Sequence, residues 1–204
     1  MNFSELVGVG KTRAWRSALI FMLAAGLAAC GTRATNDTFG LSAAPVIEGR
    51  ASTNKQILVP EPTALKALDS DQVVIRLSGS ELQYLSKAQW SDRLPRMVQA
   101  KLVQAFENTG KIGGVGKPGE GLAIDYQIIS EIRSFEISTE GGDTAVVEIF
   151  AKILNDRTGT VRAQKAFRAT TAVKGAGNPA FIKALDQAFA TVSAEIVSWT
   201  LSSI

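Results

Sequence analysis

From residue 145 to residue 153 the sequence reads Ala-Val-Val-Glu-Ile-Phe-Ala-Lys-Ile, and every second side chain from Ala145 onward is apolar. Glu148 and Lys152 fall on the opposite side of this alternation. A period of two residues is typical of a β-strand that buries one face. The run therefore predicts a strand with one buried side and one polar side.

Similar alternation continues before and after this run, over residues 122–135 and 161–173. The polar segments Glu140–Asp143 and Asn155–Gly159 contain glycine, separate the three runs and predict turns. Three strands joined by short turns form an antiparallel meander with one face buried. The alternation in the first run changes phase between residues 132 and 135, which predicts a β-bulge there.

Two segments, 94–106 and 181–199, carry apolar residues at helical spacing. Asp92 and Asn178 are the expected N-caps, and a proline that fits the first helical turn follows each of them. Two such helices can cover one face of the meander. The predicted fold class is α+β: a two-layer sandwich of a mainly antiparallel sheet with two helices packed on one face.

Shorter strands are expected before the first helix. Residues 38–42 and 56–59 each predict a short strand. Residues 73–77 and 82–85 predict the two arms of a hairpin, because Ser78-Gly79-Ser80 between them is a turn sequence.

The face of the meander opposite the helices is predicted to carry Asp125, Glu148, Arg162 and Arg168. This mixture of acidic and basic side chains suits a specific, hydrated protein interface better than a lipid groove. Arg162 and Arg168 are therefore the candidate residues for contact with a partner.

The amino-terminal segment has the pattern of a bacterial lipoprotein signal peptide. Three basic residues occur among the first 16, and the apolar run that follows, 18–26, is shorter than the roughly 20 residues that span a membrane. The run ends in Leu27-Ala28-Ala29-Cys30, which matches the lipobox. Small side chains at Ala28 and Ala29 admit the backbone to the signal peptidase, and the Cys30 thiol takes a diacylglycerol group. Several acyl chains together anchor a protein durably to a membrane.

This pattern divides the chain into a signal peptide at 1–29, a lipidated tether at 30–37 and a single domain at 38–204. Position 31 is glycine, whereas an aspartate there favours retention in the inner membrane. The expected location is the periplasmic face of the outer membrane, with inner-membrane retention as the alternative.

The composition argues against several classes of function. The chain of 204 residues has no histidine, which removes Ser-His and Cys-His nucleophile activation and imidazole zinc ligands. The net charge is only +3, and no dense run of Lys and Arg alternates with aromatic residues, so no nucleic-acid binding is expected. We expect no enzyme activity, no cofactor and no metal.

One motif resembles a nucleotide-binding sequence. Residues 114–119 match G-x-G-x-x-G, but the dinucleotide fingerprint needs a strand before it and a helix after it. Here a predicted helix precedes, a predicted strand follows and Pro118 interrupts, so residues 110–121 predict a flexible loop. Trp90 and Trp199 are expected to pack in the core.

Taken together, the chain resembles the ABC-type transport auxiliary lipoprotein family. The resemblance covers roughly residues 38–203, and its most specific part is the tract from Tyr84 to Phe106. Besides the lipobox, it is carried by Phe39-Gly40-Leu41, Val73-Val74-Ile75-Arg76, Glu81-Leu82-Gln83-Tyr84-Leu85, Gln89-Trp90-Ser91-Asp92-Arg93-Leu94-Pro95-Arg96-Met97 and Ser198-Trp199.

The resemblance implies a non-catalytic role in moving phospholipid or other hydrophobic compounds between the inner and outer membranes. The implied partners are an ABC transporter permease and ATPase and a mammalian-cell-entry-domain protein, and a homo-oligomeric ring is an implied assembly. The resemblance supplies no catalytic residues.

Two other functions remain open on the sequence. The chain could be a structural lipoprotein of outer-membrane assembly or secretion, without a lipid-transport partner. A lipoprotein hydrolase is the less favoured reading, because histidine and a nucleophile-elbow motif are both missing.

Overall fold

The computed structural model describes residues 36–42 and 52–204, which contain nine strands and two helices. The strands form one sheet. In chain order the elements are β1 (Asp37–Phe39), β2 (Thr53–Leu58), β3 (Thr63–Ala64), β4 (Gln72–Arg76), β5 (Leu82–Trp90), α2 (Leu94–Asn108), β6 (Ile112–Gly116), β7 (Tyr126–Ser138), β8 (Thr144–Asn155), β9 (Val161–Ala172) and α3 (Asn178–Ser203).

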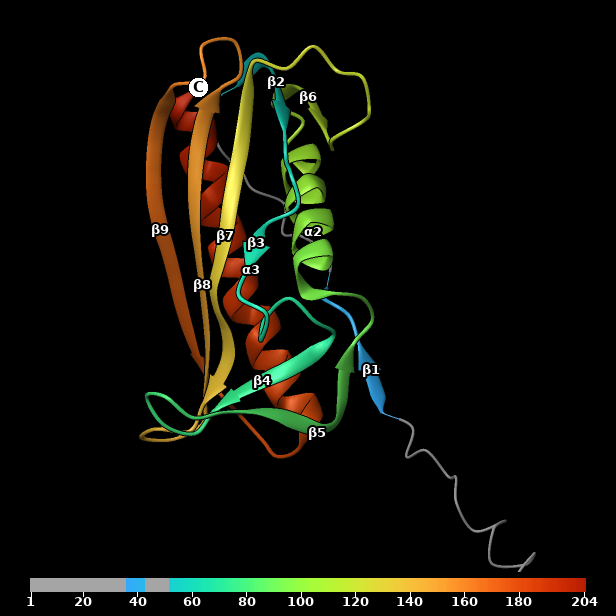
Figure 1. The fold of residues 1–204 in the computed structure, drawn as a ribbon, viewed down its shortest axis with the longest axis vertical. Helices are drawn as coiled ribbons and strands as arrows, with labels where there is room; N and C mark the ends of the chain where they lie inside the picture. The colour runs from blue at the N-terminus through green and yellow to red at the C-terminus, as the bar shows by residue number, and fades with distance from the viewer. Residues whose placement is uncertain (1–35, 43–51) are drawn as a thin grey trace, which may run out of the picture. The chain divides into compact units, whose positions relative to one another are not determined.

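Strand β7 is the centre of the sheet. One of its edges pairs with β8 along its whole length, and β8 pairs in turn with β9, both in antiparallel fashion. The other edge of β7 receives three short strands in succession: β2 at Tyr126, β3 at Glu131 and β4 at Glu136, all parallel to it. Figure 1 shows the long strands β7, β8 and β9 side by side.

The sheet is mixed, and the prediction of a mainly antiparallel sheet is not confirmed. Of the eight strand pairings among the described residues, five are parallel and three are antiparallel. The antiparallel ones include the predicted meander and the β4–β5 hairpin. The parallel ones join strands far apart in the sequence, whose partners the alternation does not reveal. The α+β class itself agrees with the structure.

The two helices occupy different places. Helix α3 contacts β9, β8 and β7, and the Trp199 ring meets the Phe167 ring of β9 edge-on at 5.3 Å. Helix α2 contacts β6 and α3 instead, and its Gln99 amide donates to the Val59 carbonyl at 2.9 Å. Figure 1 shows α3 behind β8 and β9, with α2 beside β2. The predicted arrangement, with both helices on one face of the meander, is therefore not observed.

Several local predictions are confirmed. The register of β7 against β8 shifts between Ile132 and Ser134, at the predicted bulge. Trp90 is buried, and its ring meets the Phe135 ring edge-on at 5.7 Å, so Trp90 packs in the core. Trp199 is partly buried against the same core.

Both predicted N-caps are wrong by one residue. The residues in the cap position are Arg93 for α2 and Gly177 for α3, and neither uses a side chain as the cap. Asp92 instead accepts from the Arg93 backbone N–H at 2.7 Å. The Asn178 side chain donates to the Ser86 carbonyl at 3.0 Å, which ties the start of α3 to β5.

The predicted flexible loop at 110–121 contains a strand, β6, which pairs in parallel with β2. A Cβ at Gly113 would lie 2.3 Å from the Asn54 carbonyl oxygen, so no larger residue fits there. The glycine permits close approach of two strands, which is a recognised use of glycine within a sheet. The prediction of a flexible loop is therefore wrong for Ile112–Gly116, where the glycines serve close packing of two strands.

Candidate functional site

The side of β7, β8 and β9 turned away from α3 carries the candidate site, called here the open face. Ile149, Ala151 and Ile153 of β8 are fully buried toward the helix, whereas Glu148, Phe150 and Lys152, which alternate with them, are partly exposed on the other side. This alternation is the one read from the sequence. It positions the polar side chains of three adjacent strands on one surface.

An aromatic ring with two cations close to it lies near the middle of the open face. The Arg133 guanidinium carbon of β7 is 4.2 Å from the centroid of the Phe150 ring, and the Lys152 ammonium is 5.6 Å from it. Arg133 also pairs with Glu131 at 3.2 Å. Because cations are attracted to the face of an aromatic ring, these contacts restrain long side chains that would otherwise be mobile. Arginine and aromatic residues are enriched at protein interfaces.

The structure separates the two arginines predicted to form one interface. Arg168 of β9 lies on the open face and its guanidinium is 2.9 Å from the Glu148 carboxylate. Arg162 instead donates to the Ser203 carbonyl at the end of α3, on the helix side of the sheet. The cause is a register shift near the start of β9, where Ile153 pairs with Ala163 and Leu154 with Val161, so that Arg162 has no opposite residue.

A bidentate ion pair joins β4 to β7 near the C-terminal end of β7. The Arg76 guanidinium donates to both Glu136 carboxylate oxygens, at 2.6 and 2.9 Å, and Glu136 is buried. The hydrogen bonds from Arg76 to Glu136 raise the pKa of Arg76 above its usual value. This ion pair was not predicted, because nothing in the sequence indicates that β4 lies beside β7.

Exposed apolar side chains adjoin this ion pair on the hairpin. Leu82 and Tyr84 of β5 are 40% and 47% exposed, and they lie opposite Arg76 and Val74 of β4. A tyrosine beside paired charges is a common composition for a protein interface.

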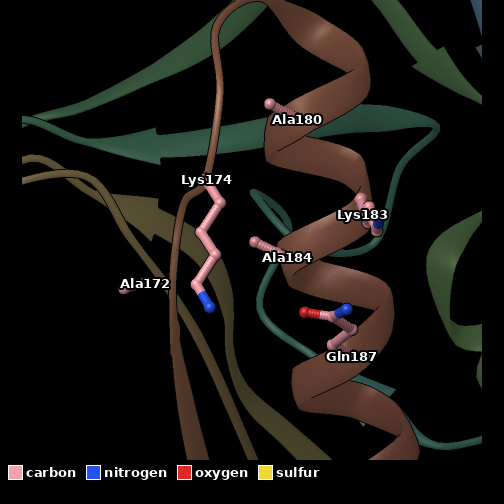
Figure 2. Close-up of a pocket in the computed structure, with 6 residues that line it drawn as sticks. All are labelled: Ala172, Lys174, Ala180, Lys183, Ala184 and Gln187. Carbon is pink, nitrogen blue, oxygen red and sulfur yellow. The ribbon is translucent and has the colours of Figure 1, made fainter.

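A hollow of about 280 Å³ lies between the end of β9 and the first turns of α3. Its lining consists of small and polar residues: Ala172, Lys174, Ala180, Lys183, Ala184 and Gln187. Figure 2 shows Lys174 extending into the gap between strand and helix, with Ala180 and Ala184 pointing toward that gap.

A second hollow, of about 220 Å³, surrounds Asp125 just before β7. The Asp125 carboxylate accepts from the Gln56 backbone N–H at 3.0 Å and lies 3.4 Å from the Lys55 ammonium. The backbone hydrogen bond from Gln56, followed by the charge of Lys55, lowers the pKa of Asp125. Asp125 therefore ties β2 to β7. The prediction that Asp125 lies with Arg168 on the open face is therefore wrong.

Within residues 36–42 and 52–204, no group of three or more acidic or thiol side chains is placed to hold a metal ion. In the same part of the chain, neither helix is both long and apolar enough to cross a membrane. The predicted lipidation residue Cys30 and the predicted peptidase-recognition residues Leu27, Ala28 and Ala29 lie outside the described residues.

Comparison with known proteins identifies relatives along most of the chain. The family model of the ABC-type transport auxiliary lipoprotein component matches residues 39–197. An uncharacterized protein of Bradyrhizobium diazoefficiens is 28% identical over 148 residues, which cover 72% of this chain and 40% of that protein. The chain therefore spans less than half the length of that curated relative.

Two solved structures share the fold. A Xanthomonas campestris protein of family DUF330 is 27% identical, with a TM-score of 0.76 over 82% of this chain and 96% of that one. A second uncharacterized protein is 16% identical, with a TM-score of 0.66 over 81% and 99% of the two chains.

Proposed function

Because the chain belongs to the ABC-type transport auxiliary lipoprotein family, we propose that it is the lipid-anchored, non-catalytic accessory component of a transport system. The system would pair an ABC transporter with a mammalian-cell-entry-domain protein and move phospholipid or other hydrophobic compounds between the inner and outer membranes. The observation that carries this proposal is the family match across 39–197.

The proposed anchor is Cys30, lipidated after removal of residues 1–29, with residues 30–37 as a tether to the domain at 38–204. Gly31 supports the outer membrane as its destination. A Cys30→Ala variant should remain an unprocessed precursor that incorporates no radiolabelled palmitate. Palmitate incorporation by this variant would contradict the anchor.

The proposed role of the domain is docking. The central part of the space between α3 and the sheet is filled by side chains such as Val147, Leu185 and Val192, all with 0% exposure, so no acyl chain fits in that part of the domain. The open face, in contrast, carries paired charges and a restrained aromatic ring. These features support a hydrated protein interface, and Arg133 with Arg168 takes the place of the predicted pair Arg162 and Arg168.

The docking proposal is tested by co-purification with the mammalian-cell-entry-domain protein of the same bacterium, using the full-length lipoprotein in detergent. Arg133→Glu and Arg168→Glu should each weaken the complex, because surface charges steer association. The free energy of unfolding of both variants should stay within about 0.5 kcal/mol of the wild-type value. Lys66→Glu, an equal charge change at an exposed residue outside the open face, is the matched control.

Three outcomes would count against the proposal. Intact complexes with both open-face variants would place the interface elsewhere. Absence of any complex with the wild type would favour the structural role in outer-membrane assembly or secretion. Stoichiometric phospholipid bound to the purified lipoprotein would favour a carrier over a docking module. The mass of the wild-type assembly would also test the proposed ring.

A further inference from the structure

The charges of this chain are distributed very unevenly. From Arg157 to Leu185 the sequence has six basic residues and no acidic one, although the whole chain has 22 basic and 19 acidic residues. The run therefore carries +6, and the remainder of the chain, with 16 basic and 19 acidic residues, carries −3. The six are Arg157, Arg162, Lys165, Arg168, Lys174 and Lys183.

Most of this basic run lies on or beside β9, which is a free edge of the sheet. Strand β9 has 12 residues and pairs with β8 on one side, and no other described strand pairs with it. Half of its backbone N–H and C=O groups therefore point outward without a strand partner. Such an edge, about 40 Å long at 3.3 Å per residue, is a template for pairing with another extended chain.

The cations lie on both sides of the strand. The Lys165 ammonium is 5.0 Å from the Phe167 ring, which itself contacts Trp199 of α3, so Lys165 is on the helix side. Arg168 is on the open face beside Glu148. An added strand whose side chains alternate between the two faces would meet a basic residue on each.

The hollow between β9 and α3 extends this surface beyond the end of the strand. Lys174 reaches into it, and the small side chains of Ala180 and Ala184 leave it open (Figure 2). Neither Lys174 nor Lys183 has an ion-pair partner among the described residues. A groove between an edge strand and a helix is the geometry that several peptide-binding domains use for strand addition.

We propose that β9 binds an extended, acidic segment of a partner protein as an additional strand of the sheet. This inference rests on the proposed docking function and names the surface and the chemistry of the partner. A second copy of this chain fits poorly, because pairing β9 with β9 would bring like charges together. A membrane fits poorly as well, because the cations lie on both faces of a strand and no single plane touches them all.

The test uses the full-length lipoprotein in detergent and a fluorescent peptide in which pairs of glutamates alternate with pairs of valines, so that the extended peptide presents glutamate on both of its faces. Two control peptides differ from it in one respect each: lysine replaces glutamate, or proline replaces two of the valines. The acidic strand peptide should bind roughly tenfold more tightly than the proline peptide, because proline cannot supply the backbone hydrogen bonds. The lysine peptide should not bind.

Hydrogen exchange identifies the contact surface. The peptide should slow amide exchange within β9 and leave β2 and β6 unchanged. Lys165→Glu should weaken binding roughly tenfold. The control Lys66→Glu makes the same charge change at an exposed site far from β9 in the sequence and should alter binding less than about twofold.

Equal binding of the acidic strand peptide and the proline peptide would show attraction between charges without strand pairing, and would overturn the proposal. Slower exchange in β9 with phosphatidylglycerol vesicles but not with the peptide would overturn it in favour of a membrane surface. A wild-type complex with the mammalian-cell-entry-domain protein, together with no peptide binding, would reject the strand edge alone. Peptide binding in the absence of a complex with the mammalian-cell-entry-domain protein would reject the proposed transport partner. It would still support β9 as a binding edge for an acidic strand.

Discussion

Strands β8 and β9 have the same length, 12 residues, and lie side by side, yet their surroundings differ sharply. Strand β8 is paired on both edges and none of its residues is fully exposed. Strand β9 is paired on one edge, and only Phe167 among its residues is buried. The difference separates a strand that stabilises the fold from one whose surface is free to make contacts. Substitutions in β8 should therefore affect stability, and substitutions in β9 should mainly affect binding.

The largest effect is expected from truncation in β8. Ile149 has 0% exposure, and Ile149→Ala should lower the free energy of unfolding by about 2–5 kcal/mol, because it leaves a cavity in a closely packed core. Gln164→Ala on exposed β9 should change it by less than about 0.5 kcal/mol. Denaturant unfolding measures both. Similar losses for the two variants would remove the proposed distinction between the strands.

Phe167→Ala tests the contribution of the buried residue of β9 to stability. The Phe167 ring contacts Trp199 of α3 and is 1% exposed, so this variant should lose about 3–5 kcal/mol even though it lies on the edge strand. A thermal or denaturant transition close to that of the wild type would mean that β9 is not held to α3 by this residue.

The Arg76–Glu136 pair predicts an intermediate effect. Arg76→Ala removes the two hydrogen bonds to a buried carboxylate, and leaving such a charge without its partner should cost about 1–3 kcal/mol. The double variant Arg76→Ala with Glu136→Gln should recover part of that loss, because the buried group is then neutral. If the double variant is no more stable than Arg76→Ala, burial of the unpaired charge is not the cause.

How far the sequence predicts the fold depends on whether the relevant neighbours are close in the chain. The alternation at 145–153, the bulge near Ser134 and the packing of Trp90 follow from local patterns and are observed. The parallel pairing of β7 with β2, β3 and β4 does not follow, because it joins segments separated by a helix and a loop. The same limit hid the ion pair between Arg76 and Glu136.

In the candidate site, a register shift in β9 makes the prediction from the alternation of side chains wrong. Counting by twos from Arg168 back to Arg162 places both on one face, but the register shift between Ile153 and Leu154 adds one residue and turns Arg162 to the helix side. A one-residue slip exchanges the faces of a strand. The sequence offers no clear signal of this second bulge.

A pH-dependent effect is expected at Asp125. The backbone N–H of Gln56 lowers the pKa of Asp125 in the folded protein, so its ionised form favours folding. This contribution is fully present above the ordinary aspartate pKa, about 4, and is lost as the pH falls through the lower folded value. Wild type should therefore exceed Asp125→Asn in unfolding free energy at pH 7 and lose that advantage progressively as the pH falls below the ordinary aspartate pKa of about 4. A difference that does not change with pH would indicate a role other than charge.

The smallest effect separates the two arginines that the sequence groups together. Arg162 donates to a carbonyl at the end of α3, where a cation also interacts favourably with the helix dipole, so Arg162→Ala should cost about 0.3–1 kcal/mol. Arg168 forms an exposed ion pair with Glu148, and Arg168→Ala should cost less than about 0.5 kcal/mol. High salt should reduce the stability loss of both variants relative to the wild type, since it screens exposed charges. The effects on partner binding should have the opposite order: Arg168→Ala should weaken the complex more than Arg162→Ala, because only Arg168 lies on the open face. If Arg162→Ala weakens the complex more than Arg168→Ala while leaving α3 intact, the partner contacts the end of α3, and the open face is not the docking surface.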